Sequence, residues 1–145
     1  MTNLLSTYSA EWPNQFSSSQ ALLTQLKATL AIATADLYAR FEKNEQVEDL
    51  ILQRSDLIDQ LLSASWQFFF PHLKEDLCLI AVGGYGRREL LPHSDIDVLL
   101  LCTEHAITEH QSALEAFITF LWDTNLNIGH SVRTINECVK IASEE

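Results

Sequence analysis

Positive charge is scarce in this sequence. Nine Lys and Arg residues stand against 20 Asp and Glu in 145 residues, which gives a formal net charge of −11 at pH 7. Proteins that bind nucleic acid neutralise its phosphates with Lys and Arg, so this balance argues against a nucleic-acid partner. A small anionic ligand would have to be met by a metal ion or by a few well-placed arginines.

Long apolar runs and patterned cysteines are also missing. No apolar run approaches the length of a membrane-spanning helix, and the N-terminus lacks the basic and apolar segments of a signal peptide. The three cysteines, Cys78, Cys102 and Cys138, are odd in number and form no C-x-x-C pair, which argues against disulfides and zinc. Cys78 and Cys102 lie in apolar runs and are predicted to be small buried residues. We therefore expect a cytoplasmic protein with no membrane partner.

Proline and glycine are few, and the N-terminal half predicts helices. Three Pro, four Gly and 47% hydrophobic residues indicate a globular chain. Apolar residues recur at helical spacing over 22–41 and again over 47–69, with polar residues between the two stretches and an N-cap available at 17–19. This pattern predicts a helical hairpin, or one long broken helix, that ends before Pro71. Residues 1–70 are expected to form a helical N-terminal region.

The pattern changes after Pro71 to short apolar runs. Strands are expected at 77–82, 95–102 and 126–133, with a short helix in YGRREL (85–90) that stops near Pro92. Capping boxes at Thr108 with Gln111 and at Thr134 with Glu137 predict two further helices, and the first of these should bury Trp122. The fold class is therefore α+β: an N-terminal helical hairpin followed by a small mixed sheet with flanking helices over residues 71–145. Because the last helical pattern is still running at Glu145, we expect a piece of a longer protein.

Three of the four glycines and a pair of acids stand close together in AVGGYGRRELLPHSDIDVLLLC (81–102). Side chains alternate along a strand, so Asp95 and Asp97 should point the same way and repel each other unless a cation lies between them. Oxygen-only ligands of this kind suit Mg²⁺. Gly83 and Gly84 would let backbone N–H groups approach an anion. The combination predicts a site for a nucleoside triphosphate.

Basic residues follow this glycine turn. Arg87 and Arg88 come directly after it and could meet phosphate charge, and Arg133 at the end of the third strand is a further candidate for phosphate contact. Tyr85 could stack on a base or serve in packing. His93 is expected in a turn.

The stretch resembles the signature of the polymerase-β-type nucleotidyltransferase superfamily. GGYGRRELLPHSDIDVLLL is similar to the nucleotidyltransferase domain of the bacterial PII-protein uridylyltransferases, which both transfer and remove uridylyl groups. LYARFEKNEQVEDLILQRSDLIDQLL and LWDTNLNIGHSVRTINECV are similar to the flanking segments of that family. The resemblance covers roughly residues 36–145.

The resemblance implies a reaction and a set of site residues. Gly83 and Gly84 would hold the triphosphate, and Asp95 and Asp97 would be the catalytic residues that bind Mg²⁺. The reaction implied is transfer of UMP from UTP to a tyrosine hydroxyl of the PII signalling protein, with release of pyrophosphate. The family's HD-type hydrolase and ACT domains are not in these 145 residues, so uridylyl removal and glutamine sensing are not expected of them.

One element of the superfamily's metal site has no clear counterpart. A third carboxylate normally comes from a later strand, where the neutral Asn127 stands in this sequence. Asp123 is more simply a residue at a helix end, so the third acid stays unassigned and is expected beyond Glu145. A nucleotidyltransferase with a small-molecule acceptor, and a module that binds nucleotide or a partner without turnover, are the alternatives.

Other reactive residues were weighed against structural roles. His130 and Ser131 could form a base and a nucleophile, but no acid is placed to orient the histidine, so a structural role is favoured. The histidines at positions 105 and 110 are scattered and suggest no metal site.

Overall fold

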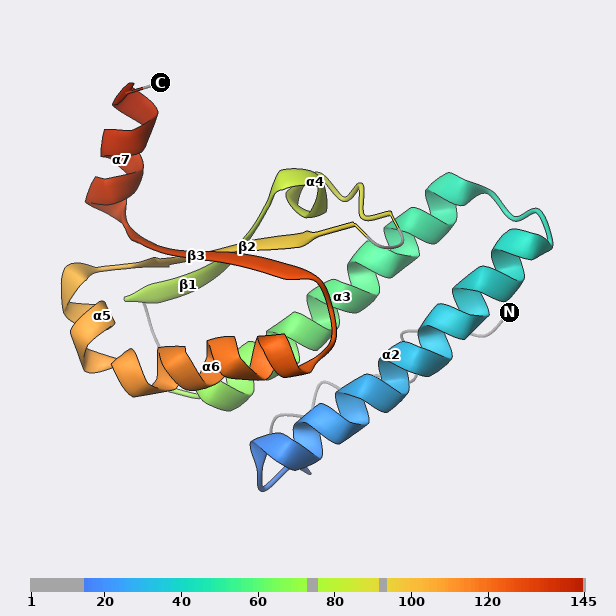
Figure 1. Cartoon of the computed structure of the whole chain (residues 1–145), viewed down its shortest axis with the longest axis horizontal. Helices are drawn as coiled ribbons and strands as arrows, with labels where there is room; N and C mark the ends of the chain where they lie inside the picture. The colour runs from blue at the N-terminus through green and yellow to red at the C-terminus, as the bar shows by residue number, and fades with distance from the viewer. Residues whose placement is uncertain (1–14, 73–75, 92–93, 145) are drawn as a thin grey trace.

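The computed structural model describes residues 15–72, 76–91 and 94–144 and shows an α+β fold (Figure 1). Helices and a three-stranded sheet follow one another in the order α2, α3, β1, α4, β2, α5, α6, β3, α7. The helices are α2 (Ser19–Glu42), α3 (Val47–Phe69), α4 (Gly83–Gly86), α5 (Glu104–Glu109), α6 (Gln111–Asp123) and α7 (Ile135–Glu144). The strands are β1 (Leu77–Val82), β2 (Ile96–Cys102) and β3 (Ile128–Thr134). Among the described residues, no helix is both long and apolar enough to cross a bilayer.

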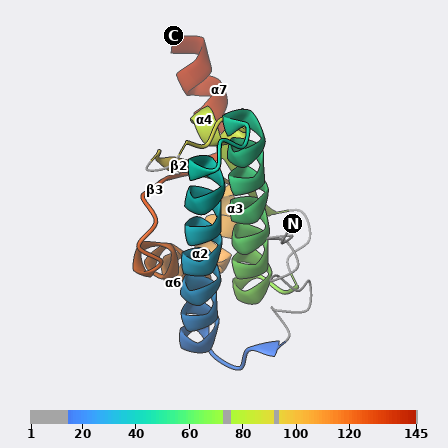
Figure 2. The same cartoon turned by 90° about the vertical axis from the view of Figure 1, so that its right-hand side faces the viewer.

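Helices α2 and α3 form the predicted hairpin rather than one broken helix, and they lie side by side (Figure 2). The Ser18 hydroxyl caps α2 by accepting a hydrogen bond from the Ala21 N–H at 3.2 Å. At the other end, the buried Arg40 guanidinium donates to Glu45 at 2.9 Å and to Gln53 at 2.7 Å. These bonds tie the last turn of α2 to the connecting loop and to α3, so they fix the hairpin.

The sheet is mixed, as predicted, with β2 at its centre. Strand β1 pairs with β2 in antiparallel register, and β2 pairs with β3 in parallel register. The parallel pair needs a crossover, which α5 and α6 supply. On the central strand, Asp97 is paired with Val82 of β1 on one side and with Gly129 of β3 on the other.

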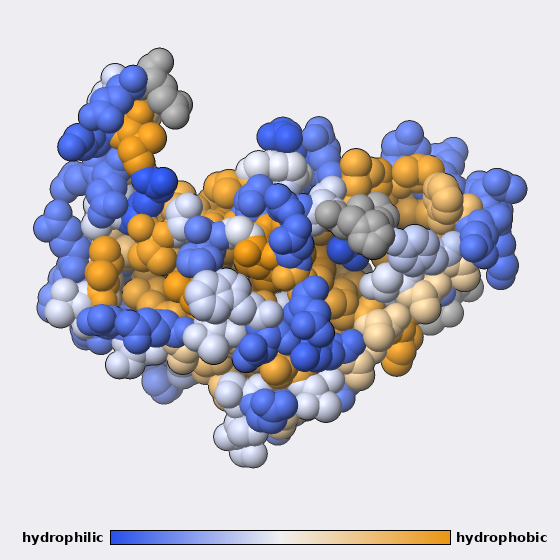
Figure 3. Space-filling view, viewed as in Figure 1, coloured by the Kyte–Doolittle hydropathy of each residue, from blue (hydrophilic) through white to orange (hydrophobic). Residues whose placement is uncertain are grey.

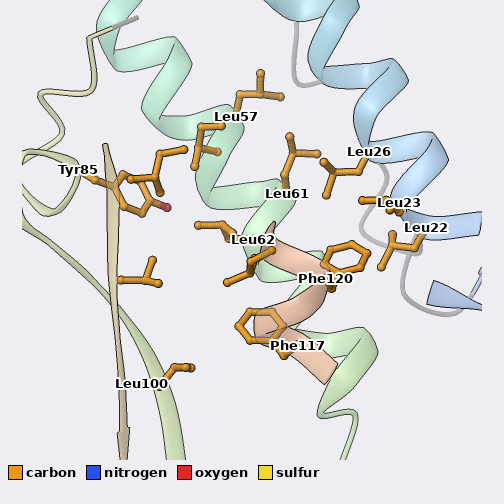
Figure 4. Packing of buried hydrophobic residues seen from close by; sticks show 14 of the residues in the cluster. Leu22, Leu23, Leu26, Leu57, Leu61, Leu62, Tyr85, Leu100, Phe117 and Phe120 are labelled. Atoms are coloured by element: carbon orange, nitrogen blue, oxygen red, sulfur yellow. The ribbon is translucent and has the colours of Figure 1, made fainter. Parts of the chain in front are cut away.

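The two faces of the sheet differ in burial. Alternate residues of β2 are fully buried, from Ile96 to Cys102, whereas Asp97, Leu99 and Leu101 are only half-buried. The buried face meets α3 and α6, where Phe117 is completely buried among Trp66, Phe69 and Phe70 at ring-centroid distances of 5.3, 5.7 and 6.0 Å (Figure 4). The opposite face is flanked by α4 and α7 (Figure 1). Asp97 therefore lies on the more open face.

Several local predictions were wrong. The capping box at Thr108 does not start a helix, because Thr103 already caps α5 by accepting from the Ala106 N–H at 3.1 Å, and α6 begins only at Gln111. The box at Thr134 is correct, since its hydroxyl accepts from the Glu137 N–H at 3.1 Å. Trp122 is 60% exposed instead of buried.

Two predictions failed around the edge strand β1. Cys78 is exposed because it lies on the open face of β1, which is at the edge of the sheet, while Cys102 on the central strand is buried as predicted. Desolvation is the main reason why the pKa of the Cys102 thiol is raised. The short helix covers Gly83–Gly86 instead of YGRREL, so Arg87 and Arg88 follow it. The turn predicted near Pro92 and His93 lies outside the described residues.

Candidate functional site

Glycine is required at two positions of the turn after β1, for different structural reasons. Gly83 has a φ of +62°, a left-handed conformation that favours glycine. A Cβ atom at Gly86 would lie 2.8 Å from the carbonyl oxygen of Ala81, which is too close for any side chain. The turn closes on itself, because the Glu89 N–H donates to the Gly84 carbonyl at 2.9 Å. The result is a tight turn at the edge of the sheet beside Asp97.

The carboxylate of Asp97 fits between two glycines from different elements. A Cβ atom at Gly83 would lie 2.8 Å from its Oδ2, and one at Gly129 would lie 2.7 Å from its Oδ1. We call this arrangement the Asp97 slot. Gly129 was not predicted as a site residue, although an isolated glycine within a strand is a signal for close approach of another group. The turn glycine and the strand glycine thus make room for an acid.

Asp95 lies one residue before β2 and opposite Asn127. The Asn127 side-chain amide donates a hydrogen bond to Asp95 Oδ1. The backbone carbonyl of Asn127 accepts a hydrogen bond from the Ile96 N–H at 2.8 Å. Strand alternation places Asp95 and Asp97 on the same face. The position expected for a third carboxylate therefore holds a neutral amide that orients Asp95.

This acid pair has the chemistry of a divalent-cation site. Within the described residues, no Lys, Arg or His forms an ion pair with Asp95 or Asp97. Asp97 is half-buried, and a carboxylate in such a position is costly without a partner. Carboxylate oxygens that keep access to solvent suit Mg²⁺, which retains water ligands and shares substrate phosphates. The donor set and the slot fit such an ion.

The turn is anchored to α3 by two acids one helical turn apart. The buried Tyr85 hydroxyl donates to Asp59 Oδ1 at 2.5 Å, and Arg88 forms an ion pair with Asp56 at 2.5 Å. Burial, and then the bond to Asp59, raise the pKa of Tyr85. At 4% exposure Tyr85 packs instead of offering its ring to a base. These contacts hold the glycine turn against a rigid helix.

The predicted arginines lie in three different environments. Arg88 has a φ of +59° and is directed to Asp56 on α3. Arg87 is exposed next to Gly84 and bonds Glu89 at 3.2 Å. Arg133 shares the open face, but it pairs with Leu101, which is four residues along β2 from Asp97 and so about 13 Å away along the strand.

His130 and Ser131 do not form a catalytic pair, because adjacent strand residues point to opposite faces. His130 lies against Trp122 with ring centroids 5.8 Å apart. Ser131 is in register with Leu99, on the open face. That face forms the hollowed part of the surface between α7 and α4 (Figure 3).

A second group of potential metal ligands was missed by the sequence analysis. Side-chain atoms of Asp76, Glu109 and His110 lie within 4.8 Å of one another. The group lies at the opposite end of the sheet, because the Asp76 carbonyl accepts from the N–H of Thr103, which directly follows β2. Only the fold brings Asp76 to the α5–α6 junction. The group is therefore separate from the Asp97 slot.

Comparison with known proteins identifies the family. The model of the nucleotidyltransferase family DUF294 matches residues 29–131, a range that includes the glycine turn, both aspartates and Gly129. The chain belongs to the DUF294 nucleotidyltransferase family. The resemblance found in the sequence is thereby confirmed, and the nucleotidyltransferase-like fold agrees with it. No solved structure matches the chain.

Curated relatives extend this DUF294 assignment. The chain is 41% identical over 133 residues to a bifunctional uridylyltransferase/uridylyl-removing enzyme of Aliivibrio fischeri, covering 92% of the chain and 15% of the relative. Enzymes of the same name from Photobacterium profundum and Hydrogenovibrio crunogenus are 41% and 42% identical, over 83% and 84% of the chain and 14% of each relative. The chain thus spans about one-seventh of the length of these relatives.

Proposed function

We propose that the chain forms the nucleotide- and metal-binding part of a Mg²⁺-dependent uridylyltransferase. The reaction would move UMP from UTP to a tyrosine hydroxyl of the PII nitrogen-regulatory protein and release pyrophosphate. The observation that carries the proposal is the Asp97 slot, in which two glycines from separate elements leave room for a carboxylate that has no ion pair among the described residues and lies beside the glycine turn. The names of the curated relatives support uridylyl transfer. Such an enzyme would act in the cytoplasm, with UTP and the PII protein as its partners.

Each residue of the site has a distinct part in this proposal. Asp95 and Asp97 would hold Mg²⁺, which when bound neutralises charge on the phosphate oxygens. Gly83 and Gly84 would offer backbone N–H groups to the triphosphate, and the exposed Arg87 would supply positive charge beside Gly84. Asp56 and Asp59 on α3 would keep the turn in place, so the phosphates meet a preorganised surface.

The reaction needs two groups that these residues do not provide. One is a base that takes the proton of the acceptor tyrosine, and the other is the third acid that normally completes the metal site. Asn127 occupies the corresponding position and cannot accept a proton or carry charge. We propose that these groups come from a further part of a longer protein, in keeping with the small share of each relative that the chain spans.

The nucleotide-binding claim is tested by ligand-dependent stabilisation. A ligand that binds the native state at 100 times its Kd stabilises it by about 2.7 kcal/mol. UTP with Mg²⁺ should therefore raise the melting temperature of the wild-type chain, and Asp97→Asn should abolish the rise. Asp123→Asn, an exposed aspartate at the end of α6, is the charge-matched control. Equal shifts in all three proteins would contradict the assignment of Asp97.

A second candidate function is nucleotide binding without turnover, which the Asn127–Asp95 bond favours. Pyrophosphate release from UTP in the presence of PII protein separates the two functions when it is measured with a longer protein that contains this chain and supplies the missing groups. A Mg²⁺-dependent thermal shift without pyrophosphate release would assign binding alone to this chain. If the acceptor is a small hydroxyl compound instead of PII protein, pyrophosphate release should depend on that compound and not on PII protein.

A further inference from the structure

An apolar cavity of about 420 Å³ lies between α2 and α3 and is separate from the metal site. Residues of α2 and α3 line the cavity together with Leu90, Leu91 and Leu126. None of the glycines or aspartates of the proposed nucleotide site lines it. Its volume falls within the range of about 300–1,000 Å³ that is usual for small-molecule sites. The cavity can therefore hold a ligand of its own.

One charged group lines this otherwise apolar cavity. The Nε atom of Arg54 is buried and has no hydrogen-bond partner among the described residues. Desolvation lowers the pKa of Arg54, and an electrostatic interaction with Tyr38 partly opposes this effect. Arg40, a buried arginine of α2, is instead paired with Glu45 and Gln53. Arg54 forms no ion pair among the described residues, so an anionic group in the cavity would supply the charge partner that the protein does not.

The rim of the cavity is unusually apolar for a solvent-exposed surface. Tyr38, Phe41, Val47 and Leu91 line the cavity and are 43–55% exposed. Hydrophobic residues reach the surface at the end of the molecule that carries the α2–α3 turn (Figure 3). Exposed apolar residues gathered around a cavity are typical of a binding site. The ligand should therefore contribute an apolar body as well as an anionic group.

We propose that the cavity binds a small amphipathic carboxylate, with its apolar body between α2 and α3 and its carboxylate on Arg54. A phosphate-rich ligand such as a nucleotide does not fit this lining, because most of its surface would lose water without gaining partners. A neutral hydrocarbon would leave the charge of Arg54 without a partner. The carboxylate class satisfies both the walls and the single charged donor.

The test compares a carboxylate and an alcohol that have the same eight-carbon chain. Octanoate and octanol are titrated separately into the whole 145-residue chain at pH 7, and binding is followed by calorimetry and thermal shift. The wild type should bind octanoate about tenfold or more tightly than octanol, because only the acid gains a charge-assisted bond. Arg54→Met should abolish this preference while it retains octanol binding. Lys140→Met, which removes one exposed positive charge on α7, should keep the preference.

Further variants locate the site and separate the sources of the ligand. Thr34→Phe fills the cavity from α2 and should weaken the binding of both ligands. If Arg54→Met does not fold, Arg54→Lys takes its place: it keeps the positive charge but not the guanidinium, and it should retain only part of the preference for octanoate. Vesicles of phosphatidylcholine with phosphatidylglycerol distinguish a membrane from a free carboxylate. Equal affinity of the wild type for acid and alcohol, unchanged binding by Thr34→Phe, or binding to vesicles without binding to octanoate would each overturn the proposal.

Discussion

Replacing Gly129 by alanine should separate metal binding from stability. The added Cβ would lie 2.7 Å from Asp97 Oδ1, against 3.4 Å for ordinary contact, so the carboxylate would have to move by about 0.7 Å (3.4 − 2.7). Gly83 bounds the slot on the other side and leaves little room for that movement. A displacement of about 1 Å in a catalytic site can cost about 100-fold in rate, and we expect UTP with Mg²⁺ to bind Gly129→Ala about 10- to 100-fold more weakly, which should remove most of the thermal shift.

The same substitution should not weaken the fold. Gly83 is the only described glycine with a positive φ, so alanine suits the backbone at Gly129. Glycine within a strand is destabilising relative to alanine by about 0.5–1 kcal/mol, and this gain opposes the strain of displacing the Asp97 carboxylate, so the stability of metal-free Gly129→Ala should lie within about 1 kcal/mol of the wild type. Chemical denaturation without metal measures stability, and the thermal shift with UTP and Mg²⁺ measures binding.

Gly86→Ala is the matched control, because its Cβ would lie 2.8 Å from a backbone carbonyl that cannot turn aside. It should destabilise the chain by about 1–3 kcal/mol with or without Mg²⁺. The reasoning is refuted if folded Gly129→Ala keeps the full shift with UTP and Mg²⁺. In that case the position of the Asp97 carboxylate would not matter for the ligand.

Three further outcomes are expected. Tyr85→Phe should cost about 1.5–3 kcal/mol in urea denaturation, because Asp59 loses a buried donor. Since the native pKa of Tyr85 is raised, its contribution is complete below its unfolded pKa of about 10 and is lost at higher pH, so the wild type should lose more stability there than Tyr85→Phe. Phe117→Ala should cost about 3–5 kcal/mol, seen as earlier unfolding by Trp fluorescence. Mass spectrometry should find iodoacetamide on Cys78 well before Cys102, and the reverse order would contradict the exposed edge strand.

Features set by short-range pattern were predictable from the sequence. The helical hairpin follows from apolar spacing and the Ser18 cap, and the cap at Thr134 follows from its glutamate three residues later. The alternation of Asp95 and Asp97 with buried Ile96 also needs only the period of a strand. These features depend on residues a few positions apart.

Features set by distant pairing were not predictable. Asp97 meets Gly129 only through the parallel register of β2 and β3, and Arg88 meets Asp56 only because α3 packs beside the turn. Cys78 looked buried by its apolar neighbours, but its burial is decided by which strand lies at the edge. No local sequence pattern predicts contacts between residues so far apart in the chain. The Asp97 slot and the acids that anchor the turn could therefore be identified only from the structure.

Unpaired charge is what marks the two proposed ligand sites in this acidic chain. Arg40 and Arg88 are neutralised by acids of the hairpin, so their charges are satisfied within the protein. Asp97 and Arg54 form no ion pair among the described residues, although both are partly buried. Folding does not favour an uncompensated charge away from water, so each position implies a ligand of opposite sign. The signs agree with the ligands proposed above: a cation at the Asp97 slot and an anion at Arg54.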